Sequence, residues 1–143
     1  MLYLMSIKPL FARQIYSERK GFELRKRGRI KEGSRIILYE TAPLKAVTGE
    51  FKAGRILLLK FSDVYRMIVE GKLRGCDKRD LNYVRGGDKI QVIEILNSKE
   101  YNVFLRLRDL RALVPRFVPP RSYIKLNKEK YGPLIRVINE FSK

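Results

Sequence analysis

The sequence SERKGFELRKRGRIKEGSR, from Ser17 to Arg35, carries eight basic and three acidic side chains in nineteen residues. Within it, the segment FELR (22–25) alternates apolar and charged side chains, which is the two-residue period of a β-strand. We expect the charged face, which includes Glu23 and Arg25, to point outward. Such a strand is either the solvated edge of an ordinary thermostable domain or a surface on which a polyanion lies.

The whole chain shares this basic character. Its 143 residues contain 32 Lys and Arg against 15 Asp and Glu, a formal net charge of +17. Residues 1–60 carry 14 basic and 5 acidic groups, and residues 61–143 carry 18 and 10, so no basic tail explains the excess. Ion-pair networks of heat-adapted proteins need near balance between the two signs. A folded body this positive repels itself, and a nucleic acid is the partner that most often relieves the repulsion.

The composition also excludes several classes of site. Cys76 is the single cysteine and histidine is absent, which removes an internal disulfide, Ser-His and Cys-His nucleophiles and a structural zinc site. The longest apolar runs, such as RILLLKF (55–61), are too short to cross a bilayer, and the N-terminus lacks the features of a signal peptide. We therefore expect a soluble cytoplasmic protein, with no metal, no cofactor and no membrane partner, in which a monomer is favoured.

Local patterns predict a mixed set of elements. Strands are expected at 2–7, 22–27 and 35–41, with a long strand over 42–60 that bends at Gly49 and Gly54. Helices are expected after Pro9, over 61–71 with Ser62 as N-cap, over 77–87, and over 132–141. Residues 88–110 read as a hairpin that turns at NSKE (97–100), and 114–126 as a proline-stiffened extended segment. The pattern indicates one α+β domain over 1–143, a small, closed or nearly closed β-barrel with capping helices and a helical insert at about 61–86.

Three segments taken in order resemble the ASCH family of the PUA-like superfamily, particularly its small stand-alone archaeal members. They are MSIKPLFARQIYSERKGFELRKR (5–27), RIILYETAPLKAVTGEFKAGRI (35–56) and FVPPRSYIKL (117–126). The resemblance implies a small β-barrel whose cleft is lined by the start of the first helix, the basic strand after it and the tyrosine-bearing strand that follows. It also implies an association with RNA, because the superfamily is linked to nucleic-acid binding.

Part of the ASCH family resembles amidohydrolases that act on acylated cytidine with a Lys, a Thr and a Glu. Their pattern of Lys, two residues, Thr, one residue and Arg is matched by Lys20 and Arg25, while Glu23 stands where the Thr would be. Glu50 is the candidate for the third acid. The resemblance therefore carries over two of the three pattern positions and leaves the hydroxyl nucleophile without a counterpart.

The candidate nucleic-acid-binding residues combine basic, aromatic and hydroxyl side chains. They are Lys8, Arg13, Lys20, Glu23, Arg25, Lys26, Arg27, Arg29, Tyr39, Arg121 and Ser122. Lys and Arg would hold phosphate oxygens, Glu23 would orient a neighbouring cation, and Tyr39 would stack on a base. The run from Arg27 through Arg29 to Lys31 and Arg35 would extend a phosphate track beyond the cleft. The alternatives are a solvated charged face for the run and a half-buried packing role for the tyrosine.

The leading hypothesis is a module that binds nucleic acid, RNA favoured over DNA, in a basic cleft. The first alternative is an enzyme, an amidohydrolase or nuclease acting on modified nucleosides or RNA, with Lys20, Glu23 and Glu50 as its acid–base groups. The second is a ribosome- or transcription-associated protein. The spacing of Asp77, Asp80 and Asp88 matches no calcium loop, so we expect no metal ligands there; Asp77 and Asp88 fit as helix and strand caps.

Overall fold

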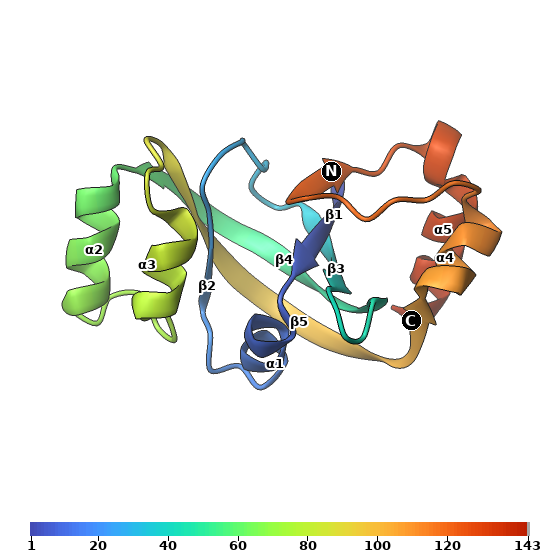
Figure 1. Ribbon diagram of the computed structural model, residues 1–143, viewed down its shortest axis with the longest axis horizontal. Coiled ribbons are helices and arrows are strands. Elements are labelled where there is room, and N and C mark those ends of the chain that lie inside the picture. The colour runs from blue at the N-terminus through green and yellow to red at the C-terminus, as the bar shows by residue number, and fades with distance from the viewer. Residues whose placement is uncertain (143) are drawn as a thin grey trace.

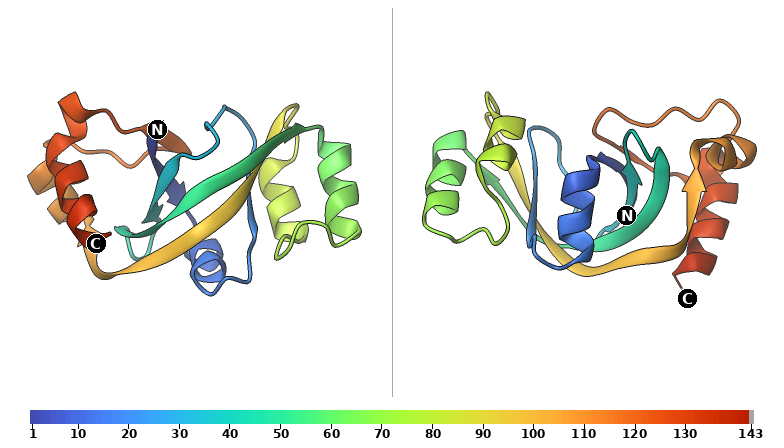
Figure 2. Two further views of the ribbon diagram at one scale, coloured as in Figure 1. Left: turned by 180° about the vertical axis from the view of Figure 1, so that it is seen from behind. Right: turned by 60° about the horizontal axis from the view of Figure 1, so that its bottom comes forward.

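Six strands form one mixed sheet that curls into a half-barrel (Figures 1 and 2). The computed structural model describes residues 1–142, so Lys143, the last residue of the predicted domain, lies outside the described residues. The spatial order is β2-β5-β4-β3-β1-β6, with bounds β1 Leu2–Ile7, β2 Phe22–Arg25, β3 Arg35–Glu40, β4 Ala46–Leu59, β5 Ile90–Arg106 and β6 Tyr123–Lys125. β1 and β3 are parallel and the other neighbours antiparallel. The predicted α+β class with a small curled barrel is confirmed.

Helices cover both ends of the sheet, as Figure 1 shows, with α2 and α3 at one end and α4 and α5 at the other. Their bounds are α1 Pro9–Tyr16, α2 Phe61–Val69, α3 Lys78–Val84, α4 Leu107–Leu113 and α5 Lys128–Phe141. Pro9 opens α1 as predicted, because its fixed φ suits the first helical turn. The two helices expected within 61–86 are present, but α2 begins at Phe61, so Lys60 rather than Ser62 is the N-cap.

The predicted hairpin over 88–110 is wrong, because β5 continues straight through NSKE (97–100). β4 offers β5 an unpaired edge along almost its whole length, and this backbone pairing outweighs the local turn preference. The register with β4 shifts at three points, and Gly49 and Gly54 lie at two of them, which confirms the predicted bends. A Cβ on Gly49 would lie 2.3 Å from the Lys99 carbonyl oxygen, so the strands approach too closely there for any other residue.

The C-terminal part contains more helix than the sequence predicts. β5 passes directly into α4, which lies where the end of the hairpin was expected. α5 begins at Lys128, four residues before the predicted start, because the Asn127 side chain accepts a hydrogen bond from the Lys130 amide at 2.9 Å and caps the helix. The short strand β6 forms within the extended segment by pairing with β1.

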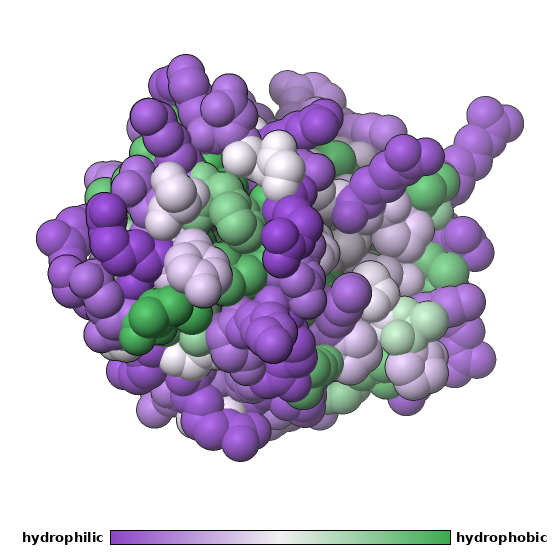
Figure 3. Space-filling view, turned by 60° about the vertical axis from the view of Figure 1, so that its left-hand side comes forward, coloured by the Kyte–Doolittle hydropathy of each residue, from purple (hydrophilic) through white to green (hydrophobic). Residues whose placement is uncertain are grey.

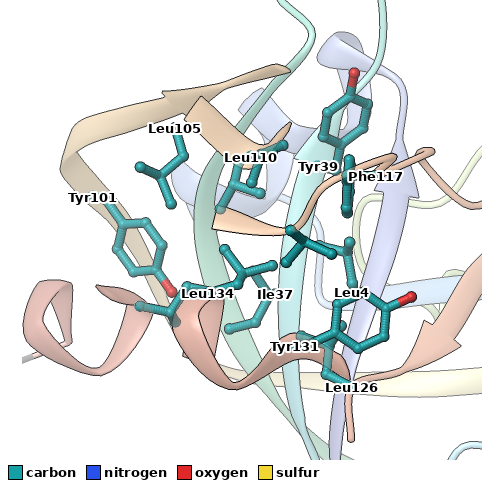
Figure 4. Packing of buried hydrophobic residues seen from close by; sticks show 13 residues of the cluster. Leu4, Ile37, Tyr39, Tyr101, Leu105, Leu110, Phe117, Leu126, Tyr131 and Leu134 are labelled. Atoms are coloured by element: carbon teal, nitrogen blue, oxygen red, sulfur yellow. The ribbon is translucent and has the colours of Figure 1, made fainter. Parts of the chain in front are cut away.

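Three groups of buried side chains fix the helices on the sheet. Under α4 and α5, residues such as Leu110 and Leu134 pack on Leu4 and Ile37 of the sheet, as Figure 4 shows. α1 buries Phe11, Ala12 and Ile15 against a second group, and α2 and α3 bury Val64, Leu81 and Val84 in a third. The third group holds the helical insert against β2 and β5, which positions α3 beside the basic strand.

A polar cluster ties the last residues of the described chain to the sheet. The Glu50 carboxylate accepts hydrogen bonds from Arg35 Nε at 2.8 Å, from the Tyr101 hydroxyl at 2.6 Å and from the Ser142 hydroxyl. Burial alone would raise the pKa of Glu50, but these donors outweigh it and lower that pKa below its ordinary value. The ionised carboxylate therefore stabilises the folded state.

We predict that Glu50→Gln lowers the free energy of unfolding by about 1–3 kcal/mol at pH 7, because a charge-assisted acceptor is lost. The pKa of Glu50 is lower in the folded protein than in the unfolded chain, where it is about 4.3. The ionised carboxylate therefore stabilises the folded state fully above about pH 4.3, and this stability is lost as the pH falls through the pKa of the folded state. Urea unfolding should therefore show the gap between wild type and variant closing below about pH 4. The exposed Glu129→Gln is the matched control, and a gap that stays constant down to pH 3 would contradict the prediction.

Candidate functional site

Both faces of β2 are covered by protein. Glu23 and Arg25, expected to point outward, are 3% and 1% exposed. The curl of the sheet brings the free edge of β2 toward β1 and the segment before β6, so the charged face of β2 closes the barrel instead of meeting solvent. The expectation of an outward charged face is wrong at these two positions, because sequence alternation does not reveal that an edge strand faces the opposite edge of its own sheet.

The Arg25 guanidinium joins the two edges of the half-barrel. Its Nη2 donates to the Ser6 carbonyl oxygen at 2.9 Å, and its Nη1 donates to the Ser122 hydroxyl at 3.2 Å. Its Nε donates to Glu23 Oε2 at 2.9 Å, so the charge is paired within the same strand. The planar five-donor group is suited to bridge three partners at once.

Lys20 completes this buried cluster from the loop before β2. Its ammonium donates to Asp80 of α3 and lies 4.0 Å from Glu23 Oε1. Burial alone would lower the pKa of Lys20, but the neighbouring carboxylates, Glu23 foremost, raise it above its ordinary value, so the side chain is a buried cation and not a free amine base. Two cations and two anions make the cluster neutral overall when all four are ionised.

A cleft of about 510 Å³ lies beside this cluster. Its lining consists of Lys26, Arg27, Gly28, Tyr83, Ser122 and Tyr123. Tyr83 is 38% exposed, and its ring has the Arg25 guanidinium 5.4 Å and the Lys8 ammonium 5.9 Å from its centroid. The cleft thus combines a cationic rim, a hydroxyl and an aromatic ring, which are groups that bind phosphate and a nucleobase.

Gly28 and Gln91 hold the wall of the cleft in place. Gly28 has φ +98°, and a Cβ there would lie 1.7 Å from the Tyr123 hydroxyl, so only glycine lets that ring pass over the loop. Gln91 donates to the Arg27 carbonyl oxygen at 2.8 Å and accepts from the Ile30 amide at 2.6 Å. These bonds fix the loop that carries the basic residues after β2.

The structure brings only part of the predicted set to this cleft. Lys26, Arg27 and Ser122 line it, and Lys8 lies at its rim. Arg121 is exposed next to Ser122, and Arg29 lines a neighbouring hollow. Lys20, Glu23 and Arg25 lie together, but buried.

Three predicted residues lie elsewhere. Tyr39 is 3% exposed and packs against Phe117 in the core, so its ring is not placed to stack on a bound base. Arg13, on α1, forms ion pairs with Glu40 of β3 and Glu100 of β5. Glu50, the proposed third acid, belongs to the cluster with Arg35 at the C-terminal end of the chain and is not among the partners of Lys20.

Sequence reasoning missed Asp80 and Tyr83. The sequence predicts only that Asp80 is not a metal ligand, but the Asp80 carboxylate accepts hydrogen bonds both from Lys20 and from the Asp77 amide, the latter at 2.9 Å as part of a capping box. The spacing of Asp77 and Asp80 signals that box, but nothing in the sequence signals the contact across 60 residues.

Burial raises the pKa of the nearby Cys76 to about 12, so its thiol stays protonated.

No group of His, Cys, Asp and Glu side chains within residues 1–142 is arranged to hold a metal ion. In the same part of the chain, every helix is too short or too polar to cross a membrane.

No family model matches the sequence, and no curated protein matches it. The structure is similar to that of an ASCH protein from Zymomonas mobilis, with a TM-score of 0.80 and 24% identity over 95% of this chain and 94% of that chain. A mutant form of that protein gives the same TM-score at 23% identity over 95% of each chain. The N-terminal domain of Staphylothermus marinus McrB gives 0.58 at 11% identity, over 94% and 93%. The chain therefore has the ASCH fold, in agreement with the resemblance in its sequence.

We predict that Lys20→Met alone destabilises the protein by about 3–5 kcal/mol, because it leaves a buried carboxylate without its cation. Asp80→Asn removes the carboxylate charge but keeps an oxygen acceptor for the Asp77 amide. The variant with both substitutions should therefore lose much less stability than the sum of the losses in the two single variants. A double-mutant cycle by urea unfolding measures this coupling. Additivity within about 0.5 kcal/mol would contradict a direct Lys20–Asp80 ion pair.

Proposed function

We propose that the protein is a nucleic-acid-binding module, with RNA favoured over DNA, that holds the polyanion at the cleft between β2, α3 and β6. The observation that carries this proposal is the cleft itself, whose lining combines Lys26 and Arg27 with the Ser122 hydroxyl and the Tyr83 ring. Some cations elsewhere, such as Arg13 and Arg35, have carboxylate partners, and others, such as Lys128 and Lys130, have none within residues 1–142. Lys26 and Arg27 have no ion-pair partner within residues 1–142.

Neighbouring cations without ion-pair partners repel one another and so destabilise the folded protein, unless a bound anion neutralises them. A phosphodiester backbone supplies anions at regular spacing, and releasing its counterions favours binding. In this arrangement Lys26 and Arg27 hold phosphate oxygens, Tyr83 faces a base and Ser122 offers a hydroxyl for hydrogen bonding. The preference for RNA rests on the ASCH fold and the association of PUA-like proteins with RNA.

The buried cluster has a supporting role in this proposal. Because the charges of Lys20, Glu23, Arg25 and Asp80 compensate one another, they contribute little to the attraction of a polyanion. Arg25 instead fixes the Ser122 hydroxyl at 3.2 Å and lies under the Tyr83 ring, so it positions two groups of the cleft. The module would act as one domain and as a monomer, in the cytoplasm, where a single free cysteine is commonly found.

The enzymatic alternative has one specific observation in its favour. Lys20 and Glu23 lie together with an acid, Asp80, in the place of Glu50. The raised pKa of Lys20 works against a role as general base, since the amine holds its proton in a double ion pair. A turnover assay of the wild-type protein on acylated cytidine separates the two: product formed above the level of a protein-free control would favour the amidohydrolase.

The binding proposal predicts the behaviour of Lys26→Ala combined with Arg27→Ala. Affinity for labelled single-stranded RNA, measured by fluorescence anisotropy, should fall, and the slope of log affinity against log salt should become shallower by about 1.4, because each lost phosphate contact removes about 0.7 from the slope for a single strand. Lys128→Ala with Lys130→Ala, which removes two exposed cations from α5, is the matched control and should leave the slope almost unchanged. Equal effects of the two pairs would remove the cleft from the proposal.

A further inference from the structure

A second hollow lies next to the cleft, on the side of the molecule that carries α2 and α3. The second hollow, about 470 Å³, shares Lys26, Arg27 and Gly28 with the cleft. Its remaining lining residues are Arg29, Leu58, Gly86, Gly87, Asp88 and Lys89. The loop after β2 therefore separates the two hollows and contributes cations to both.

A third hollow, about 390 Å³, extends the series in the same direction. It shares Arg29, Leu58, Asp88 and Lys89 with the second hollow, and it also includes Lys60, between the end of β4 and the start of α2. We call the three hollows together the basic track. Figure 3 views the molecule from this side, where hydrophilic side chains surround small hydrophobic patches.

The charges along the basic track are strongly one-sided. Its cations are Lys26, Arg27, Arg29, Lys60 and Lys89, against the single anion Asp88. Within residues 1–142 none of these five cations forms an ion pair. They come from three separate places in the chain, so the track is a product of the fold and not of the charge run alone. Lys31 and Arg35 of that run line none of the three hollows, and Arg35 is bound to Glu50.

The basic track also offers surfaces for bases. Leu58 is 39% exposed between the second and third hollows, and Gly86 and Gly87 leave their stretch of wall without side chains. A single strand presents phosphates and the faces of its bases side by side, and so it needs cations next to apolar or aromatic ledges. A duplex stacks its bases inside and presents mainly phosphates, which leaves such ledges unused.

From this arrangement we infer that a single-stranded nucleic acid leaves the cleft in one direction and runs along the basic track toward Lys60. The inference rests on the proposed function and adds that the bound nucleic acid is single-stranded, which path it follows and how many nucleotides the site holds. With one nucleotide in each hollow, the track holds about three nucleotides, a short site by the standard of single-strand-binding domains. Tyr123, whose hydroxyl lies over Gly28, forms the wall of the cleft at the other end.

The test uses oligouridines of two to eight nucleotides and an RNA duplex, titrated into the purified protein and measured by calorimetry or anisotropy. Affinity should rise with length to about three or four nucleotides and then level off, and the single strand should bind more tightly than the duplex. Lys60→Ala with Lys89→Ala should weaken octamer binding by about tenfold at low salt and dinucleotide binding by a smaller factor, because Lys60 lines only the third hollow whereas Lys89 also lines the second. Both side chains are exposed, and the Lys60 side chain makes no capping hydrogen bond, so the variant should fold.

Two results would overturn the inference while leaving the proposed function intact. In the first, the Lys60 and Lys89 variant binds the octamer as tightly as a variant lacking Lys128 and Lys130 does. In the second, the duplex binds as tightly as the single strand. Failure of the wild-type protein to bind any of these nucleic acids would overturn the proposed function itself.

Discussion

The Arg25 guanidinium spans the gap between β2 and the opposite edge of the same sheet, and the shape of the cleft depends on that bridge. It binds the Ser6 carbonyl oxygen and the Ser122 hydroxyl across the gap and Glu23 within its own strand. The sheet has no continuous backbone ladder at this closure, since β2 and β6 are the two edges of its order. A side chain with five donors takes the place of that ladder and leaves an opening at one side, which is the cleft.

Two sets of charges with opposite consequences lie on either side of this closure. Inside, Lys20, Glu23, Arg25 and Asp80 neutralise one another and join the strand to α3. Outside, the cations of the basic track have no such partners. Surface cations elsewhere, such as Lys128 and Lys130, also lack ion-pair partners within residues 1–142, so pairing alone does not distinguish the basic track. What distinguishes it is that five cations and a single anion line three neighbouring hollows. This arrangement is the basis of the proposed binding of a polyanion.

Local physics explains how much of this the sequence could predict. Pro9 and the apolar run before it predict the first strand and helix, and Gly49 and Gly54 predict the bends of β4, because each effect acts over a few residues. The inward course of Glu23 and Arg25 depends on the curl of the whole sheet. The continuous course of β5 depends on the length of its partner, β4. Asp80 and Tyr83 enter the site only because the helical insert folds back on β2, a contact across about 60 residues that no local pattern reveals.

The most direct test of the central claim is an NMR titration of the isotope-labelled protein with a short single-stranded RNA. If the cleft and the basic track form the binding surface, backbone amide shifts should change at residues 26–29, 58–60, 83–89 and 122–123, in proportion to the bound fraction. Residues 106–116 and 128–136, which also carry exposed cations, should change little. Shifts confined to those C-terminal segments would contradict the claim, because they would show that nucleic acid binds to the general positive charge and not to the cleft.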